Sequence, residues 1–348
     1  MINRTILGCG MTQRVAWALA LGALLLGGDS SWRVLAQNQP NRVPLEPLEV
    51  VQLQPNFYMI AGAGSNIAVQ IGPEGVILVD AGTAQMADAV VATIKRLTNQ
   101  PIRYIINTSA DADHVAGNET IARAGRSLFS GNAGGGAVAG GTAANNDGAA
   151  SIVAAEPVLL RMSAPTGQQA LYATVAWPTE TFTRKQKSLY LNNEAIQVMF
   201  QPAAHTDGDS IVFFRRSDVV AAGDVFDMTR FPVIDTEKGG SIQGEIDALN
   251  RLMEIVVPSI PLPFKEGGTQ IIPGHGRVSE QAELVEYRDM VTIVRDGVQS
   301  LIKKGLTLQQ IKAANPTQGF RSRYGSDSGP WTTEMFVEAV YKGLTVKK

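Results

Sequence analysis

Cysteine and histidine are scarce in this 348-residue sequence, which holds one cysteine, Cys9, and three histidines. A single cysteine excludes a disulfide within the chain and a cysteine-rich structural zinc site. Charged residues make up 18% and hydrophobic residues 45% of the chain, which is typical of a globular protein with a sizeable core and not of a disordered one. Metal ligands must therefore come from histidine, aspartate and glutamate.

The sequence also lacks a hydrophobic run long enough for a membrane-spanning helix near its N-terminus. The apolar run from Val15 to Leu26 has 12 residues, whereas a helix needs about 20 to cross a bilayer. Arg4 and Arg14 precede this run, and Val34-Leu35-Ala36 offers small residues to a signal peptidase. We expect residues 1–36 to be a cleaved signal peptide, and the protein to be periplasmic or secreted with no permanent membrane anchor.

An excess of positive charge is absent as well. The chain has 30 basic and 32 acidic residues, and loss of residues 1–36 would leave 27 and 31, a formal net charge of −4. Nucleic-acid binding usually needs a basic surface that neutralises phosphates. We therefore expect no nucleic-acid partner and a small-molecule substrate instead.

The part of the chain that follows has the pattern of a layered α/β domain. Residues 37–55 are polar and punctuated by proline, which predicts an extended lead-in, and the domain is expected over residues 56–348. A buried strand is predicted at Gly75–Asp80, a helix at Ala84–Leu97 and a strand at Ile102–Asn107. The order strand, helix, strand predicts helices packed on a sheet.

Further along, residues 131–150 consist almost entirely of Gly, Ala, Asn and Thr. This composition predicts a flexible loop, either an inserted linker or a flap over an active site. The other predicted strands are 195–200, 210–215, 219–222 and 270–272, and the other predicted helices are 116–124, 242–257, 280–304 and 333–341.

Polar residues that could carry chemistry gather where the predicted strands end. One cluster is the loop Asn107–His114 after a strand, and the others lie in AHTDGD, AGDVF and IIPGHG. Open sheets usually carry their binding sites at such strand ends. The candidate metal ligands are Asp111, Asp113, His114, His205, Asp224 and His275.

In these motifs the sequence resembles the metallo-β-lactamase superfamily, whose hallmark is HxHxDH on one loop, then a distant His, a bridging Asp and a final His. The resemblance extends from about Phe57 to Tyr341, and AHTDGD, AGDVF, FPVID, GGSIQG and IIPGHG are similar to bacterial cyclase-like or glyoxalase-like hydrolases. It implies an αββα sandwich of two mixed β-sheets flanked by helices. The corresponding positions hold Ser109, Asp111, Asp113, His114, His205, Asp224 and His275.

The first two hallmark histidines are replaced, by Ser109 and Asp111. The family's first metal site takes three histidines, of which His205 remains, and Asp111 would hold a metal only through water or after a backbone movement. The resemblance implies one or two divalent ions, with zinc foremost and manganese or ferrous iron competing, because oxygen ligands favour harder ions. A single-metal or otherwise altered centre is expected. The second site keeps all its residues, Asp113, His114, Asp224 and His275.

Three carboxylates, those of Asp111, Asp113 and Asp224, would converge in such a centre. They require either a cation between them or protons on some of the carboxyl groups. Asp207 and Asp209 are interpreted as turn formers and Ser109 as a spacer. Two interpretations stay open for Arg230, a structural arginine or a contact to an anionic substrate, and two for Phe57–Met59, a hairpin packed on the core or a substrate mouth.

The resemblance implies a metal-dependent hydrolase of a small ester, lactone, thioester or amide, with β-lactam cleavage left open. Asp113 is the expected catalytic residue, because a carboxylate beside the metal would position water or carry a proton. The alternative is a non-catalytic binding or scaffold protein of the same fold with a decayed metal site. Ser109 together with Asp111 favours this alternative.

Overall fold

A computed structural model describes most of the chain from residue 48 onward. The expected signal peptide, residues 1–36, lies outside the described residues, as do residues 37–47 of the expected lead-in. The Gly/Ala-rich segment 131–150 also lies outside them, apart from residues 148–150. The described ranges are 48–128, 148–164, 168–259 and 267–345.

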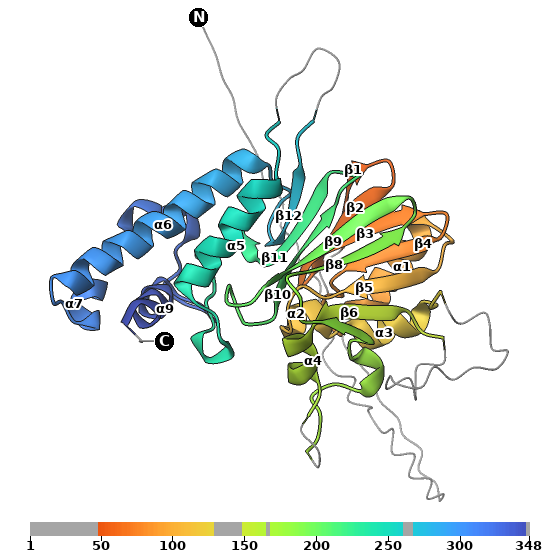
Figure 1. Ribbon diagram of the computed structural model, residues 1–348, viewed down its shortest axis with the longest axis horizontal. Coiled ribbons are helices and arrows are strands. Elements are labelled where there is room, and N and C mark those ends of the chain that lie inside the picture. Colours follow the sequence, from red (N-terminus) through yellow and green to blue (C-terminus); the bar gives the residue numbers. More distant parts are fainter. Residues whose placement is uncertain (1–47, 129–147, 165–167, 260–266, 346–348) are drawn as a thin grey trace, which may run out of the picture. The chain divides into compact units, whose positions relative to one another are not determined.

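The first half of the domain forms one mixed β-sheet (Figure 1). Its strands in the described ranges are β1 (Glu49–Gln54), β2 (Phe57–Ala63), β3 (Ser65–Gly72), β4 (Gly75–Val79), β5 (Ile102–Ile106), β6 (Ser151–Ala155) and β7 (Glu180–Phe182). They lie side by side in chain order, antiparallel from β1 to β4 and parallel from β4 to β7.

The second half forms a smaller mixed sheet. Its strands in the described ranges are β8 (Gln186–Leu191), β9 (Glu194–Gln201), β10 (Asp209–Phe214), β11 (Val219–Asp227) and β12 (Gln270–His275). The order is β12-β11-β10-β9-β8, and only the β11–β12 pair is parallel.

Helices follow the strands of both sheets. The short 3-10 turns η1 (Thr174–Ala176), η2 (Thr236–Lys238) and η3 (Gln318–Phe320) lie between them. The α-helices of the described residues are α1 (Ala87–Leu97), α2 (Ala112–Val115), α3 (Asn118–Ala124), α4 (Glu156–Met162), α5 (Ile242–Ile255), α6 (Gln281–Lys303), α7 (Leu308–Ala313), α8 (Arg321–Tyr324) and α9 (Thr333–Thr345).

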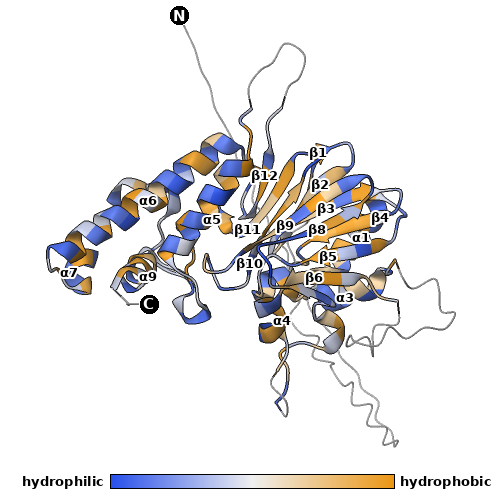
Figure 2. Ribbon diagram, viewed as in Figure 1, coloured by the Kyte–Doolittle hydropathy of each residue, from blue (hydrophilic) through white to orange (hydrophobic). Residues whose placement is uncertain are grey.

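Alternation along the strands builds the layers. In β4, Ile77 faces the second sheet and Leu78 faces α1, since successive side chains of a strand point to opposite faces. In β11, Val220 packs in the cluster that includes α5, α6 and α9, whereas Ala221 packs between the sheets. Figure 2 shows long hydrophobic stretches along the strands of both sheets. The fold is therefore the expected αββα sandwich of two mixed sheets flanked by helices.

Most predicted elements occur within a few residues of their expected bounds, but the structure adds others. The strand β1 lies within the segment expected as a lead-in, so the sheet begins before residue 56. The elements β6, α4, β7 and β8 were not predicted.

Phe57 is fully buried against Phe214 between the sheets, so it packs on the core and does not form a substrate mouth. In the described part of the chain, no helix combines the length and apolarity needed to span a bilayer.

Candidate metal centre

Parallel strands bring the candidate ligands to one edge of the sandwich. Asp80 follows β4, and the loop from Asn107 to His114 follows β5, its parallel neighbour. Asp224 lies in β11 and His275 ends β12, which is parallel to it. Because parallel strands have their carboxyl ends at the same edge, residues far apart in the sequence meet there.

The first group of possible ligands comprises Asp113, His114 and His275, whose ligand atoms lie within 4.8 Å of one another. His275 Nε2 lies 3.2 Å from Asp113 Oδ2 and 3.6 Å from Asp224 Oδ1. The hydroxyl of Ser65 donates to the Asp113 carbonyl at 2.7 Å, which ties the ligand loop to β3. The structure thus brings together the residues expected at the second site of the family.

His114 is held by a buried network that the sequence interpretation missed. Its Nδ1 lies 2.9 Å from Asp80 Oδ2. Thr108 donates its backbone N–H and its hydroxyl to the two oxygens of the same carboxylate, at 2.8 and 2.7 Å. Since Asp80 accepts from Nδ1, the lone pair of the neutral imidazole is on Nε2. This arrangement directs His114 Nε2 toward the centre.

The second group comprises Asp111, His205 and Asp224, again with ligand atoms within 4.8 Å of one another. His205 Nε2 lies 2.8 Å from Asp111 Oδ2 and 3.7 Å from Asp224 Oδ2. Its Nδ1 lies 2.7 Å from the Val233 carbonyl oxygen, to which it donates. Asp111 therefore reaches His205 directly.

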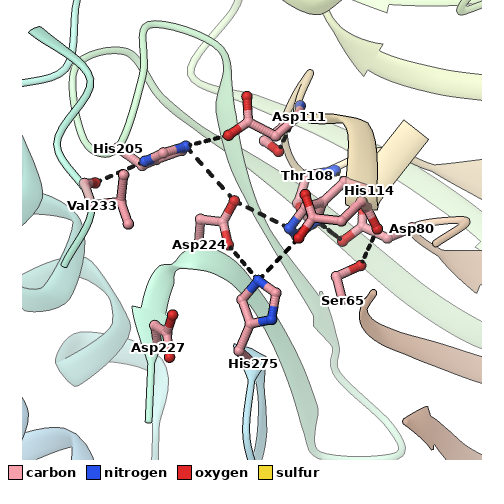
Figure 3. A network of polar contacts seen from close by, with 12 residues as sticks. Ser65, Asp80, Thr108, Asp111, His114, His205, Asp224, Asp227, Val233 and His275 are labelled. Carbon is pink, nitrogen blue, oxygen red and sulfur yellow. Dashed lines mark hydrogen bonds and ion pairs between the residues drawn. The ribbon is translucent and has the colours of Figure 1, made fainter. Parts of the chain in front are cut away.

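Asp224 belongs to the second group and also contacts His114 and His275 of the first. Figure 3 shows its carboxylate among the three imidazoles, with Oδ2 3.1 Å from His114 Nε2. The strand is irregular here, because the pairing of β11 with β12 shifts register on both sides of Gly223. Gly274 lies so close that a Cβ there would be 2.8 Å from Asp224 Oδ1. The position expected for a bridging carboxylate is therefore built by a strand bulge and a glycine.

The protons of the centre lie on histidines rather than on carboxylates. Burial alone would raise the pKa of Asp224, but the neighbouring imidazoles, His114 foremost, hold it well below its usual range. Burial also opposes the charge of His205, yet its hydrogen bond to Asp111 raises its pKa to about 10. The same contact lowers the pKa of Asp111 to about 2 against the effect of burial. Without a cation, the carboxyl groups of the centre therefore stay ionised and pair with imidazolium groups.

Other candidates have structural roles. The Ser109 hydroxyl is buried and accepts from the Asp111 backbone N–H at 3.3 Å, as a spacer would. Asp209 accepts from the backbone N–H and the hydroxyl of Thr206, at 2.6 and 2.9 Å, and forms the turn that was expected. Asp207 instead pairs with Arg161 at 2.6 Å.

A cavity of about 560 Å³ opens beside His275. Met59 and Asn66 line it together with Arg230 and Arg277. Arg230 Nε lies 2.9 Å from Asp227 Oδ2, and its side chain is 35% exposed. Arg230 is therefore tied to β11, as a structural arginine would be, and it also lies at the cavity wall; its contact with an anionic substrate stays a prediction.

Comparison with protein families assigns the fold directly. A family model for the metallo-β-lactamase superfamily matches residues 60–259, and the chain belongs to this superfamily. A search of curated proteins found no match.

Solved structures agree with this assignment. The stereoselective inverting sec-alkylsulfatase Pisa1 from Pseudomonas sp. is 15% identical with a TM-score of 0.60, over 85% of this chain and 50% of that one. A metallo-β-lactamase from Pontibacter korlensis is 17% identical with a TM-score of 0.51, over 70% of this chain and 99% of its own. The chain thus spans about half the length of the alkylsulfatase. At these identities the likeness concerns the fold.

The residues present fit a divalent ion at one of the two groups. His114 Nε2 is completely buried and makes no well-formed hydrogen bond to any group in the described residues, although it points at Asp224. Such a nitrogen costs free energy unless a ligand satisfies it. Asp113, Asp224 and His275 supply the further donors. The Asp111 group fits less well, since Asp111 and His205 already satisfy each other.

Proposed function

We propose that the chain is a metal-dependent hydrolase of a small ester, lactone, thioester or amide. A divalent ion, zinc foremost, would be held by Asp113, His114, Asp224 and His275. The observation that carries this proposal is the buried Nε2 of His114. Asp80 directs it at the centre, where it lies 3.1 Å from Asp224 Oδ2 without a well-formed hydrogen bond to any of the described residues. Manganese and ferrous iron compete with zinc, because two of these ligands are carboxylates.

The chain's own residues have distinct tasks in such a reaction. A divalent ion held by these residues would polarise a scissile bond and lower the pKa of a bound water molecule. Asp113 is the ligand with the most exposed side chain, 34%, against 19% for His275. A carboxylate in that place can hold a water molecule or accept its proton. Asp80 and Thr108 keep His114 in the tautomer that a metal ligand needs.

The cavity beside His275 supports a substrate that carries a negative charge. Arg230 and Arg277 both line it, together with Glu49. The two arginines pair with Asp227 and Glu283, but their side chains are still 35% and 64% exposed. A guanidinium binds carboxylate, sulfate or phosphate groups with paired hydrogen bonds. An alkylsulfatase and a metallo-β-lactamase are among the similar structures, which agrees with hydrolysis of an anionic substrate. Cleavage of a β-lactam lies within this proposal.

One observation favours a second candidate, a non-catalytic binding protein with a decayed centre. Asp111 and His205 pair with each other at 2.8 Å, where the family would place ligands of a first metal. A chain that has lost both sites would keep the fold and bind a small molecule in the same cavity.

Metal content and hydrolysis measured together decide between the candidates. We expect protein purified without added metal, then incubated with zinc, to hold one ion per chain by elemental analysis. His275→Ala should lose the ion. Its rate of hydrolysis on a panel of esters and lactones should fall by more than the roughly 10- to 100-fold that loss of a supporting residue costs.

His205→Ala is the matched control, because it removes an imidazole of the same centre. It should keep the ion. A folded wild-type chain that takes up no zinc, manganese or iron would make the binding protein the better account.

A further inference from the structure

A lysine reaches the place where the family's first metal would be. Lys238 ends the turn η2, and its Nζ lies 3.3 Å from Asp111 Oδ1 and 3.0 Å from Asp235 Oδ2. The sequence interpretation did not single it out. The two oxygens of Asp111 are thus divided between Lys238 and His205.

The backbone holds this lysine in place. The Asp235 carboxylate accepts from the backbone N–H groups of Glu237 and Lys238, at 3.1 and 3.0 Å, and so closes the turn. The Asp235 N–H in turn donates to the His205 carbonyl at 2.9 Å. The turn that carries Lys238 is therefore tied directly to the loop that carries His205.

Two more contacts fix the end of the turn. The backbone N–H of Asp207 and the guanidinium of Arg161 donate to the Lys238 carbonyl, at 2.9 and 2.8 Å. A Cβ at Gly240 would lie 2.1 Å from the His205 carbonyl oxygen, so only glycine allows these two segments of the chain to approach this closely. These contacts distinguish Lys238 from a surface lysine whose position is set by its side chain alone.

The charge of Lys238 works against a second metal ion. A divalent ion on Asp111 would have to replace the ammonium and the His205 contact, or share the carboxylate with a positive charge a few ångströms away. The replacement of the hallmark histidines by Ser109 and Asp111 also works against a second metal ion. A carboxylate forms an ion pair with an ammonium group, whereas a neutral imidazole in its place would offer no opposite charge.

We infer that Lys238 is a built-in cation that takes the place of the first metal, so that the centre holds one divalent ion. Lys238 acts through Asp111 and is a positioning residue. It occupies one oxygen of Asp111 through its Nζ and places a fixed positive charge beside the His205 contact. This inference rests on the proposed function, because it presupposes an ion at Asp113, His114, Asp224 and His275.

Zinc titration of metal-free protein tests the inference by stoichiometry, which does not depend on activity. Wild type should bind one zinc ion per chain by calorimetry and by elemental analysis after gel filtration. Lys238→Met removes the charge and keeps most of the side-chain length, and it should bind two. Lys238→Arg restores the charge and should return the value to one.

Lys312→Met is the matched control. Lys312 also pairs with two carboxylates, at 3.0 Å from Glu338 and 3.8 Å from Glu334, but it lies on α7. It should bind one ion, like wild type. Adding His205→Ala to Lys238→Met should remove the second ion again.

The outcomes separate the two proposals. One ion in both wild type and Lys238→Met, or two in both, overturns the role of Lys238 and leaves the metal-dependent hydrolase intact. No ion in any folded variant overturns the proposed function and this inference with it. Melting curves of each variant establish that the comparison is between folded chains.

Discussion

At the scale of single residues, the centre depends on a carboxylate that is not itself a ligand. Asp80 has a left-handed backbone conformation, with φ of 67°, which is uncommon outside glycine, although asparagine and aspartate adopt it more readily than other residues. Its side chain accepts from Thr108 and contacts His114 within the buried interior. The strain is tolerated because these buried hydrogen bonds hold the residue in place.

Asp80→Asn tests this role. The amide keeps the size of the side chain but loses the charge that orients His114, and it can present a donor where Nδ1 needs an acceptor. We expect zinc affinity to fall roughly 10- to 100-fold, the usual cost of losing such a partner. Asp88→Asn on the exposed face of α1 is the control and should titrate like wild type. Unchanged affinity in Asp80→Asn would show that His114 is oriented by its packing alone.

The two residues missed by sequence reasoning differ in how they could have been found. Asp80 follows a strand that was predicted, so the rule that placed the other candidates at strand ends applies to it equally. Lys238 has no such signal. It meets Asp111 across 127 residues, and the turn that carries it is positioned by backbone hydrogen bonds to the His205 loop. Contacts of this kind follow from the tertiary fold and not from any local pattern.

At the scale of elements, long and strongly periodic segments were predictable. The strand β4 and the helix α6 fall close to their expected bounds. β4 is a continuous apolar run that is buried throughout, and the buried residues of α6 recur at every third or fourth position. The strands β7 and β8 were missed. β7 has three residues and β8 alternates exposed and half-buried positions near the edge of its sheet, so neither carries a strong apolar signal.

Another element-scale feature is the close contact between β12 and the bulge of β11, which Gly274→Ala tests. The added methyl group would lie 2.8 Å from Asp224 Oδ1 and 2.9 Å from the Gly223 carbonyl oxygen. Overpacking of this kind costs about 1–3 kcal/mol. We expect a lower melting temperature and weaker zinc binding, because Asp224 must move.

Gly297→Ala is the matched control for this substitution. Gly297 lies within α6, and its nearest neighbour for a new Cβ is Pro316 at 3.8 Å. Alanine there should stabilise the chain by about 0.5–1 kcal/mol, because glycine is unfavourable inside helices. If both variants melted alike, the approach of β12 to Asp224 would be looser than the structure shows.

At the scale of the whole molecule, the charges of the centre link its stability to pH. His205 has a pKa of about 10 in the folded chain against 6.5 as its ordinary value, so its ion pair stabilises the fold fully below about pH 6.5 and is lost as the pH rises toward 10. Asp111 has a pKa of about 2 against 3.8, so its contribution is present above pH 3.8 and is lost as the pH falls toward 2. The metal-free chain should therefore be most stable between these limits.

A bound ion should oppose this loss of stability at alkaline pH. The ligand histidines must release their protons to bind metal. Burial would lower the pKa of His275, but the contact with Asp113 raises it. Zinc binding should therefore strengthen as the pH rises. We expect the melting temperature of metal-free protein to fall from pH 6 to pH 9, by on the order of 2–4 °C for each kcal/mol lost. The gap between zinc-loaded and metal-free protein should widen over the same range. Melting curves at both pH values, with and without zinc, measure this directly, and a flat metal-free profile would mean that His205 and Asp111 do not form a charged pair.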